Sequence, residues 1–456
     1  MIKINLLGLH ILLYAIIFFS FERADGINLA FSLLISFLII NEYLNDKFFF
    51  LSANKIFLLG GYYYLVVFPF FYSIGFIKAE TFSSNDLSFA CLASLLAIVG
   101  YIIGRNLFLL YSPAIDFSHV NKIDNFYGFG KRKIDIFLLF VFLTSMIFFM
   151  NLYSSITTFL NLGLLVVLFS YAYFHTNRKL LKNIFLLSIF IFACFVTLSI
   201  SGSRVDLIKI FISTAFLYLF LSKKRIKLSY FIMFGGLLFI GAVHATIFRT
   251  WSSIEDDLGA ANIFEAYYMI FDINKGFLGF ILALGDIGIA YDNLIYLVRE
   301  IDSSNLLMGV SLIRPLFVII PRSLWASKPL DTQSLIVEER LGEGLSEFGG
   351  GTSQSITLVG DFFWNFSFFG PFMGFVIFGF LIIFFDKKIH YCKSITSLMF
   401  MAVLIPFFFV SWRGAFSSQL IYTVFSILPL IFLIILHKIF IEFKISPKND
   451  DVVKKY

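Results

Sequence analysis

Residues 86–111 have the sequence DLSFACLASLLAIVGYIIGRNLFLLY, an apolar run with Asp86 at its start and Arg105 near its end. At about 1.5 Å per residue, a helix of this length crosses a hydrocarbon core about 30 Å thick. The run is therefore typical of a membrane-spanning helix. Further apolar runs are predicted to span the membrane in the same way, near 4–21, 27–41, 56–77, 134–153, 155–175, 183–201, 205–222, 228–247, 366–385, 395–412 and 418–440.

The composition of the whole chain indicates the same class. Hydrophobic residues make up 59% of its 456 residues, charged residues make up 14%, and the mean hydropathy is +0.90. Soluble domains carry about 25% charged residues. We expect an all-α fold, a polytopic membrane helix bundle with about 12 transmembrane helices. Nucleic-acid binding is not expected, in spite of the net charge of +6.

The cysteines do not indicate a disulfide or a metal site. Cys91 and Cys194 lie inside apolar runs, and neither they nor Cys392 lie in the long polar segment between residues 249 and 360. No HExxH, CxxC, GxSxG or phosphate-loop motif occurs in the chain. The acidic pair Asp256–Asp257 is better explained by a solvated turn than by a metal. We therefore expect neither a metal nor another cofactor.

The first two spans raise separate questions. Lys3 precedes the run 4–21, but the following residues 22–26 do not form a small-residue cleavage site and another span begins at Ile27. We expect a retained first helix. The second run, 27–41, either stands alone as a short helix or continues into Phe48–Phe50.

The positions of lysine and arginine predict the orientation. If the N-terminus is cytoplasmic, the most basic connecting segments all lie on the cytoplasmic side. The predicted organisation is 1–247 with spans one to nine, 248–361 as one large periplasmic loop, 362–442 with spans ten to twelve, and 443–456 as a cytoplasmic tail. We expect a bacterial inner-membrane protein with both termini in the cytoplasm.

The large loop contains two further apolar segments. Residues Ile263–Leu284 are interrupted by charged residues, a pattern that fits an amphipathic helix at the membrane interface better than a span. The run Leu306–Pro321 is broken at Arg314–Pro315, and each half is too short to cross the bilayer. We expect this run to form a re-entrant or interfacial hairpin packed against protein.

Arginines at the predicted outer boundary are the candidate site residues. Guanidinium groups bind phosphate bidentately and keep their charge in a cleft of low dielectric constant. The alternative for each is that it snorkels to the interface or pairs with a nearby carboxylate, as Arg204 would with Asp206. The six arginines are Arg204, Arg249, Arg314, Arg322, Arg340 and Arg413.

The segment IPRSLWASKP, residues 320–329, combines several of these features. Arg322 lies between two prolines that stiffen the segment. Trp325 is suited to stacking on a sugar ring, and Lys328 supplies a second cation.

Three loop motifs together resemble the O-antigen polymerase (Wzy) family. They are IPRSLWASKP, the glycine-rich GGGTSQS at 349–355, and LVGDFFWNFSFFGPFMGF at 358–375. The SGSR turn at 201–204 and WRGAF at 412–416 are similar to the family's other outer arginine positions, and Arg340 with Gly351 matches its Arg-x10-Gly pattern. The chain departs from the family at Asp361, where glutamate is usual, and at Ala326, where proline is usual.

The resemblance implies glycosyl transfer at the outer face of the inner membrane. The donor would be a growing glycan on undecaprenyl pyrophosphate and the acceptor a lipid-linked repeat unit, with membrane lipid around the protein and a chain-length regulator protein as a candidate partner. Asp361 is the first candidate base because its aromatic setting is expected to raise its pKa. His244 is the second, against a packing role, and Glu338 and Glu339 follow, against a solvated helix face.

The predicted site residues therefore fall into two groups. The catalytic group is Asp361, His244, Arg322 and Arg413. The substrate-binding group is Arg204, Arg249, Arg314, Trp325, Lys328 and Arg340. An O-antigen ligase would share the lipid donor and differ in its acceptor. A lipid-linked oligosaccharide flippase would also have many spans, but it should place charges along a central cavity, and Arg105 and Lys209 both lie nearer a helix end than the middle.

Overall fold

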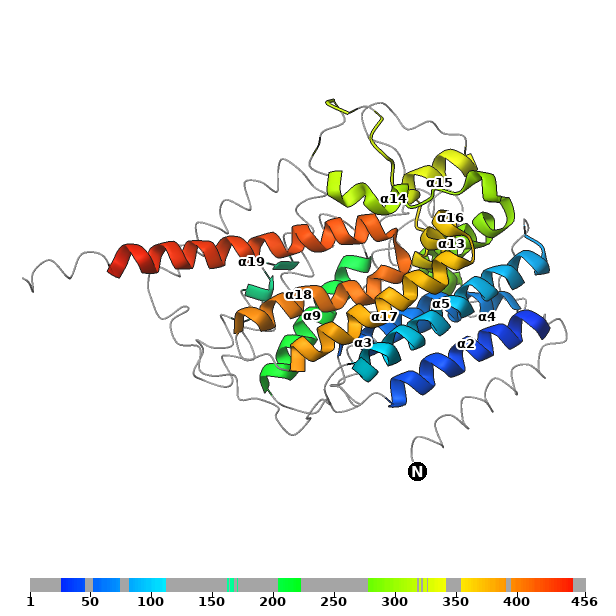
Figure 1. The fold of residues 1–456 in the computed structure, drawn as a ribbon. Helices are drawn as coiled ribbons and strands as arrows, with labels where there is room; N and C mark the ends of the chain where they lie inside the picture. Colours follow the sequence, from blue (N-terminus) through cyan, green and yellow to red (C-terminus); the bar gives the residue numbers. More distant parts are fainter. Residues whose placement is uncertain are drawn as a thin grey trace, which may run out of the picture. The chain divides into compact units, whose positions relative to one another are not determined.

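A computed structural model gives the fold of the chain. It describes residues 26–45, 52–73, 82–111, 162–163, 165–167, 170, 204–222, 278–317, 320, 323–325, 327–341, 354–390 and 395–445. Within these ranges every regular element is a helix (Figure 1). The all-α prediction is confirmed for this part of the chain.

The chain divides into two compact units. The first unit comprises residues 1–120, 252–391 and 407–421, and the second comprises 121–251, 392–406 and 422–456. Helices of the first unit are α2 (Gly26–Asn45), α3 (Ala53–Leu65), α4 (Val67–Ser73), α5 (Ser84–Tyr111), α13 (Leu278–Glu300), η2 (Ser303–Asn305), α14 (Val310–Ile313), η3 (Arg314–Phe317), α15 (Thr332–Leu341), α16 (Leu358–Phe366), α17 (Phe369–His390) and η4 (Ser411–Arg413). The second unit contains α9 (Arg204–Ser222), and both units share α18 (Ile395–Val410) and α19 (Phe416–Ile445).

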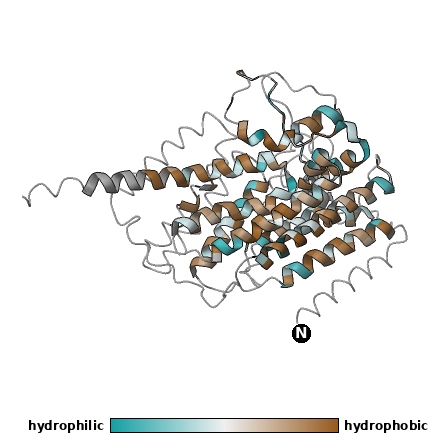
Figure 2. Ribbon diagram, in the orientation of Figure 1, coloured by the Kyte–Doolittle hydropathy of each residue, from teal (hydrophilic) through white to brown (hydrophobic). Residues whose placement is uncertain are grey.

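Among the described residues, five helices are long and apolar enough to cross a membrane. They are Ile27–Asn45, Ala53–Ser73, Ser84–Tyr111, Phe369–Ile389 and Thr396–Arg413. Their length and composition mark the chain as a membrane protein. Apolar residues predominate along α2, α5 and α17, whereas polar residues gather on α15 (Figure 2).

These five helices coincide with predicted spans. Two further predicted spans, 205–222 and 418–440, coincide with α9 and α19. The predicted spans 4–21, 134–153, 183–201 and 228–247 lie outside the described residues, as does most of 155–175. The total of about twelve spans, and the position of the large loop, stay predictions.

The second predicted span is longer than its apolar run. Helix α2 continues through the polar residues after position 41 and ends at Asn45. Within the extension, the carboxylate of Glu42 forms an ion pair with Arg105 near the end of α5. At the opposite ends of the same helices, Asn28 donates to Ser84. Helices α2 and α5 are therefore parallel.

Small residues let α5 and α17 pack closely. Gly100 and Gly104, four positions apart on α5, lie against the backbone of Phe372 and Val376, and Gly379 of α17 lies against Tyr101. A Cβ atom at any of the three glycines would overlap the backbone of the other helix. Such small-residue stripes are typical of helix pairs in membranes, where close backbone approach supplies the packing energy.

An aromatic cluster fixes the segment that precedes α19. The fully buried Trp412 packs its ring on Phe57 and Phe375, with centroid distances of 4.5 and 4.8 Å. Its indole N–H donates to the backbone carbonyl of Phe57 over 2.7 Å. The η4 turn is thereby attached to α3 and α17, and this attachment positions the neighbouring Arg413.

The predicted tenth span begins later than expected and follows a separate helix. Thr357 caps α16 by accepting from the N–H of Gly360, and the helix ends at Phe366. Ser367 then has a φ of 52°, which reverses the chain before α17 begins at Phe369. Asp361 therefore lies on α16, outside the spanning helix α17.

The segment before η2 is a helix of the packed interior. Residues 263–277 of the predicted interfacial helix lie outside the described residues, and α13 extends from Leu278 to Glu300, beyond the predicted end at Leu284. Tyr291, Leu294 and Ile295 on α13 are fully buried. Helix α13 packs against α5 and α16.

Candidate functional site

Asp361 is fully buried and both of its carboxylate oxygens accept hydrogen bonds. One oxygen accepts from the backbone N–H of Phe416 over 2.7 Å. The other accepts from the hydroxyl of Ser311 over 3.3 Å and from the amide of Asn365 over 3.4 Å. Asn365 lies one helical turn after Asp361 on α16 and also donates to Ser311 over 2.7 Å. Three separate segments therefore meet at this carboxylate.

Burial raises the pKa of Asp361 to about 6. Removal from water disfavours the charged form, and the negative charge of Asp331 acts in the same direction. Hydrogen bonds from Phe416 and Ser311 oppose the shift because they stabilise the carboxylate. The raised pKa agrees with the expectation from the aromatic sequence around Asp361.

Arg314 forms an ion pair with Asp331. The distance between the guanidinium Nη1 and the Asp331 carboxylate is 2.7 Å, and both side chains are largely buried. Asp331 also caps α15, since its second oxygen accepts from the N–H of Ser334 over 2.7 Å. Arg314 therefore pairs with a nearby carboxylate, which was one of the alternatives considered for each candidate arginine.

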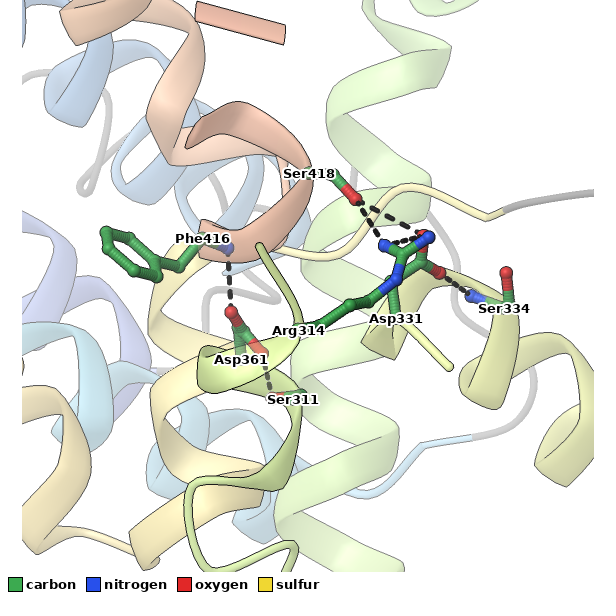
Figure 3. Close-up of polar contacts among 7 residues, drawn as sticks. All are labelled: Ser311, Arg314, Asp331, Ser334, Asp361, Phe416 and Ser418. Carbon is green, nitrogen blue, oxygen red and sulfur yellow. Dashed lines mark hydrogen bonds and ion pairs between the residues drawn. The ribbon is translucent and has the colours of Figure 1, made fainter. Parts of the chain in front are cut away.

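The first turn of α19 joins the two carboxylates. Phe416 donates its backbone N–H to Asp361, and two residues later the hydroxyl of Ser418 contacts both Asp331 and Arg314, at 3.3 and 3.5 Å. Figure 3 shows the Arg314 side chain extending from the segment beside Asp361 toward Asp331. A helix N-terminus favours nearby negative charge, so α19 helps hold both acids.

A second hydrogen-bonded chain connects Arg413 with Arg340. Arg413 donates its Nε–H to the hydroxyl of Ser355 over 3.1 Å. The carbonyl of Ser355 accepts from the amide of Asn293 over 2.7 Å, and the amide oxygen of Asn293 accepts from Arg340 over 2.5 Å. Arg340 also lies over the ring of Tyr296, 5.2 Å from its centroid. Two predicted site arginines are therefore linked through only two intervening residues.

Asp292 lies beside this chain and was not among the predicted site residues. Burial raises the pKa of Asp292 to about 6, and the positive charge of Arg340 opposes the shift. Its Oδ1 atom is buried and has no hydrogen-bond partner among the residues that the structure describes. A buried carboxylate oxygen without a partner is unusual, because such an atom loses its hydration without compensation.

Lys328 and Trp325 make local contacts within their own loop. The ammonium of Lys328 donates to the backbone carbonyl of Ile320 over 2.9 Å. The Trp325 ring packs edge-on against Phe317, and its indole N–H donates to the hydroxyl of Ser327 over 2.9 Å. These contacts hold the loop after η3 together.

The remaining predicted site residues fall elsewhere. His244, Arg249 and Arg322 lie outside the described residues. Arg204 is the first residue of α9 in the second unit. Asp206, considered as its ion-pair partner, forms an ion pair with Lys209 over 3.0 Å. The structure thus places Arg314, Arg340, Arg413 and Asp361 in the first unit, in two separate networks. Arg314 and Asp361 belong to one network, and Arg340 and Arg413 belong to the other.

Several participants in these networks were missed by sequence reasoning, among them Asp292, Asn293, Asp331 and Ser355. Asp331 carries one local signal, because an aspartate directly before a helical segment is a favoured N-cap. The others have no such signal, since their partners lie more than 40 positions away in the sequence.

The two networks combine guanidinium groups with two acids whose pKa is about 6. They are suited to binding an anionic group and to accepting a proton. Within the ranges that the structure covers, no cluster of three or more histidine, cysteine, aspartate or glutamate residues is suited to holding a metal ion. No family model matches the chain, and no curated protein or solved structure is detectably similar to it.

Proposed function

We propose that this membrane protein polymerises undecaprenyl-pyrophosphate-linked oligosaccharide repeat units into an O-antigen-type polysaccharide. The observation that carries the proposal is the hydrogen-bonded chain from Arg413 through Ser355 and Asn293 to Arg340. Guanidinium groups fixed in this way are suited to a pyrophosphate. The resemblance of the loop motifs to O-antigen polymerases supports the same substrate.

In the proposed reaction the bond between the donor sugar C1 and the pyrophosphate oxygen breaks. The pyrophosphate leaves with the electron pair and stays on undecaprenol, and the oxygen of an acceptor hydroxyl forms the new bond to C1. The acceptor proton passes to a carboxylate. The arginines stabilise the charge that develops on the leaving group. No nucleotide is hydrolysed in this reaction, because the donor already carries a pyrophosphate leaving group.

Two carboxylates of the first unit are candidates for the base. Asp361 has a raised pKa, but both of its oxygens already accept hydrogen bonds and its side chain is fully buried. Asp292 has a similarly raised pKa, lies beside Arg340, and has a buried Oδ1 without a partner in the described part of the chain. We therefore propose Asp292 as the acceptor of the proton and Asp361 as a residue that positions the start of α19.

Reconstitution with a synthetic lipid-linked repeat unit tests the proposal. The purified chain in lipid vesicles, without added nucleotide, should convert single repeat units into products of many repeats, separable by length on a gel. Absence of products longer than one repeat, with the protein folded, would contradict the proposal. Transfer of a preformed chain to a lipid A core acceptor, without elongation, would identify a ligase instead.

A further inference from the structure

In the segment that follows α13, polar side chains face the interior of the protein and apolar side chains face outward. On α14 and η3, Ser311 and Arg314 are three positions apart and contact Asp361 and Asp331 inside the protein. Val310, Ile313 and Leu316 repeat at the same spacing and are exposed, Leu316 to 77%. A helical segment that faces water normally has the reverse arrangement.

The exposed apolar surface continues beyond η3. Leu324 is 80% exposed and Ile320 is also exposed, although both belong to the loop that Lys328 and Trp325 hold together. Met308, before α14, is exposed as well. Contiguous exposed apolar surface on a folded chain marks a contact with another molecule or with lipid.

A strained turn attaches this surface to α16. Met308 and Gly309 both have positive φ angles, of 48° and 86°. The backbone N–H groups of Leu307 and Met308 donate to the carbonyls of Trp364 and Asn365, and Gly309 donates to the Asn365 side chain. A left-handed conformation is unfavourable for methionine, so the packing around it must hold the turn.

The surface is continuous with the exposed face of a membrane-spanning helix. Phe366, at the end of α16, has its ring against Gly309, and Phe369 at the start of α17 is 65% exposed. From Phe369 an exposed apolar stripe follows one face of α17 through Met373, Ile377, Phe380, Leu381 and Phe384. Since α17 has the length and composition of a membrane span, this stripe is expected to face lipid.

We propose that a set of exposed apolar side chains, with Phe366 and Phe369, forms a lipid-facing surface embedded in the membrane interface. The set comprises Met308, Val310, Ile313, Leu316, Ile320 and Leu324. The occupant of this surface is the acyl-chain region of the bilayer. The inner face of the same segment carries Ser311 and Arg314, so the polar network would lie directly behind a layer in contact with lipid. The proposal does not depend on the polymerase activity.

Lipid quenching of site-specific fluorophores tests this placement in the full chain, reconstituted in phosphatidylcholine nanodiscs. Bimane is attached to Leu316→Cys, Leu324→Cys, Ile377→Cys and Glu338→Cys in turn. Labelling of the unsubstituted chain is subtracted, because it contains Cys91, Cys194 and Cys392. Ile377 lies on the exposed stripe of α17 and Glu338 is exposed on α15, so they are the lipid and water references.

We expect phosphatidylcholine with a nitroxide near its headgroup to quench the labels at 316 and 324 more strongly than the label at 377, which lies deeper along α17. A nitroxide deep in the acyl chain should quench the label at 377 most strongly. The label at 338 should instead be quenched by aqueous iodide. Iodide quenching at 316 and 324 equal to that at 338 would overturn the proposal. Protection of both labels from lipid and iodide alike would also overturn it, and would assign the surface to a second copy of the chain or to another protein.

Discussion

The carboxylate of Asp361 accepts a 2.7 Å hydrogen bond from the backbone N–H of Phe416, the first residue of α19. Asp361 therefore stabilises a helix N-terminus from a different segment of the chain. The charged carboxylate suits this position electrostatically, but its complete burial disfavours the charge, and burial has the larger effect on its pKa.

The raised pKa of Asp361 gives a prediction for stability. Because its pKa is about 6 in the folded protein against 3.8 for the free side chain, the folded protein binds the extra proton between about pH 4 and pH 6. The contribution of this group to stability is thus lost as the pH rises through that window. Keeping the carboxylate ionised costs on the order of 3 kcal/mol at pH 7.5.

Asp361→Asn removes this cost, since the amide oxygen can accept from Phe416 and the NH2 group can donate to the Ser311 hydroxyl. Only the 3.4 Å hydrogen bond from Asn365 is lost. We expect a higher thermal midpoint than the wild type at pH 7.5 in detergent, with the two midpoints converging at pH 4. Asp302→Asn, at an exposed position, is the control and should match the wild type at both pH values. A lower midpoint of Asp361→Asn at pH 7.5 would show that the carboxylate is needed in its charged form.

Asp331 offers a prediction in which two roles can be separated. Asp331→Ser keeps an N-cap for α15 and removes the ion pair with Arg314, whereas Asp331→Ala removes both. Loss of the cap alone typically costs about 1 kcal/mol, so the alanine variant should unfold at a lower temperature than the serine variant. Equal midpoints for the two variants would mean that the cap contributes nothing measurable.

The contact between α5 and α17 predicts an unusually sensitive glycine. The Cβ of Gly104→Ala would overlap the backbone carbonyl of Val376, which cannot move without displacing α17. We expect this single methyl group to lower the thermal midpoint and the yield of monodisperse protein. Ile103→Ala, at an exposed position on the same helix, is the matched control. Wild-type behaviour of Gly104→Ala would show that the two helices are less closely packed.

The sequence was sufficient to predict the helices that depend on local composition. Long apolar runs predict spans such as α5 and α17 because crossing a hydrocarbon core requires a minimum length of apolar helix. The aromatic residues beside Asp361 likewise predict its raised pKa. Both features depend on neighbours that are close in the sequence.

Features that depend on distant partners could not be predicted in this way. Helix α16 ends at Phe366, where Ser367 adopts a positive φ. The sequence around this break is as apolar as that of α17, so hydropathy alone does not predict it. The role of Asp292 depends on Arg340, and that of Ser355 on Arg413. A single sequence contains no signal for such pairs when the partners lie on different helices.

The linked arginines predict a loss of activity without a loss of the protein. Arg413→Ala removes a guanidinium held by Ser355. Loss of its contribution to charge stabilisation should lower the rate of polymerisation by about 100-fold or more. Arg299→Ala, at an exposed position on α13, is the control and should retain the wild-type rate. The measurement is the length distribution of polysaccharide, with membrane levels of each variant checked by immunoblot. Long polysaccharide in Arg413→Ala cells at the wild-type level would exclude a role in the reaction.

Asp292 and Asp361 can be distinguished as bases by their asparagine variants. A base must be deprotonated to accept a proton. If Asp292 is the base, the rate of polymerisation should fall as the pH decreases through about 6. Asp292→Asn should lower the rate by about 100-fold or more and remove this pH dependence from the residual activity, since an amide cannot accept the proton. Asp361→Asn should leave the pH dependence in place, because it preserves the contacts at the start of α19. If Asp361→Asn instead abolishes the reaction while Asp292→Asn retains it, the base is Asp361, and its bond to Phe416 must open during the reaction.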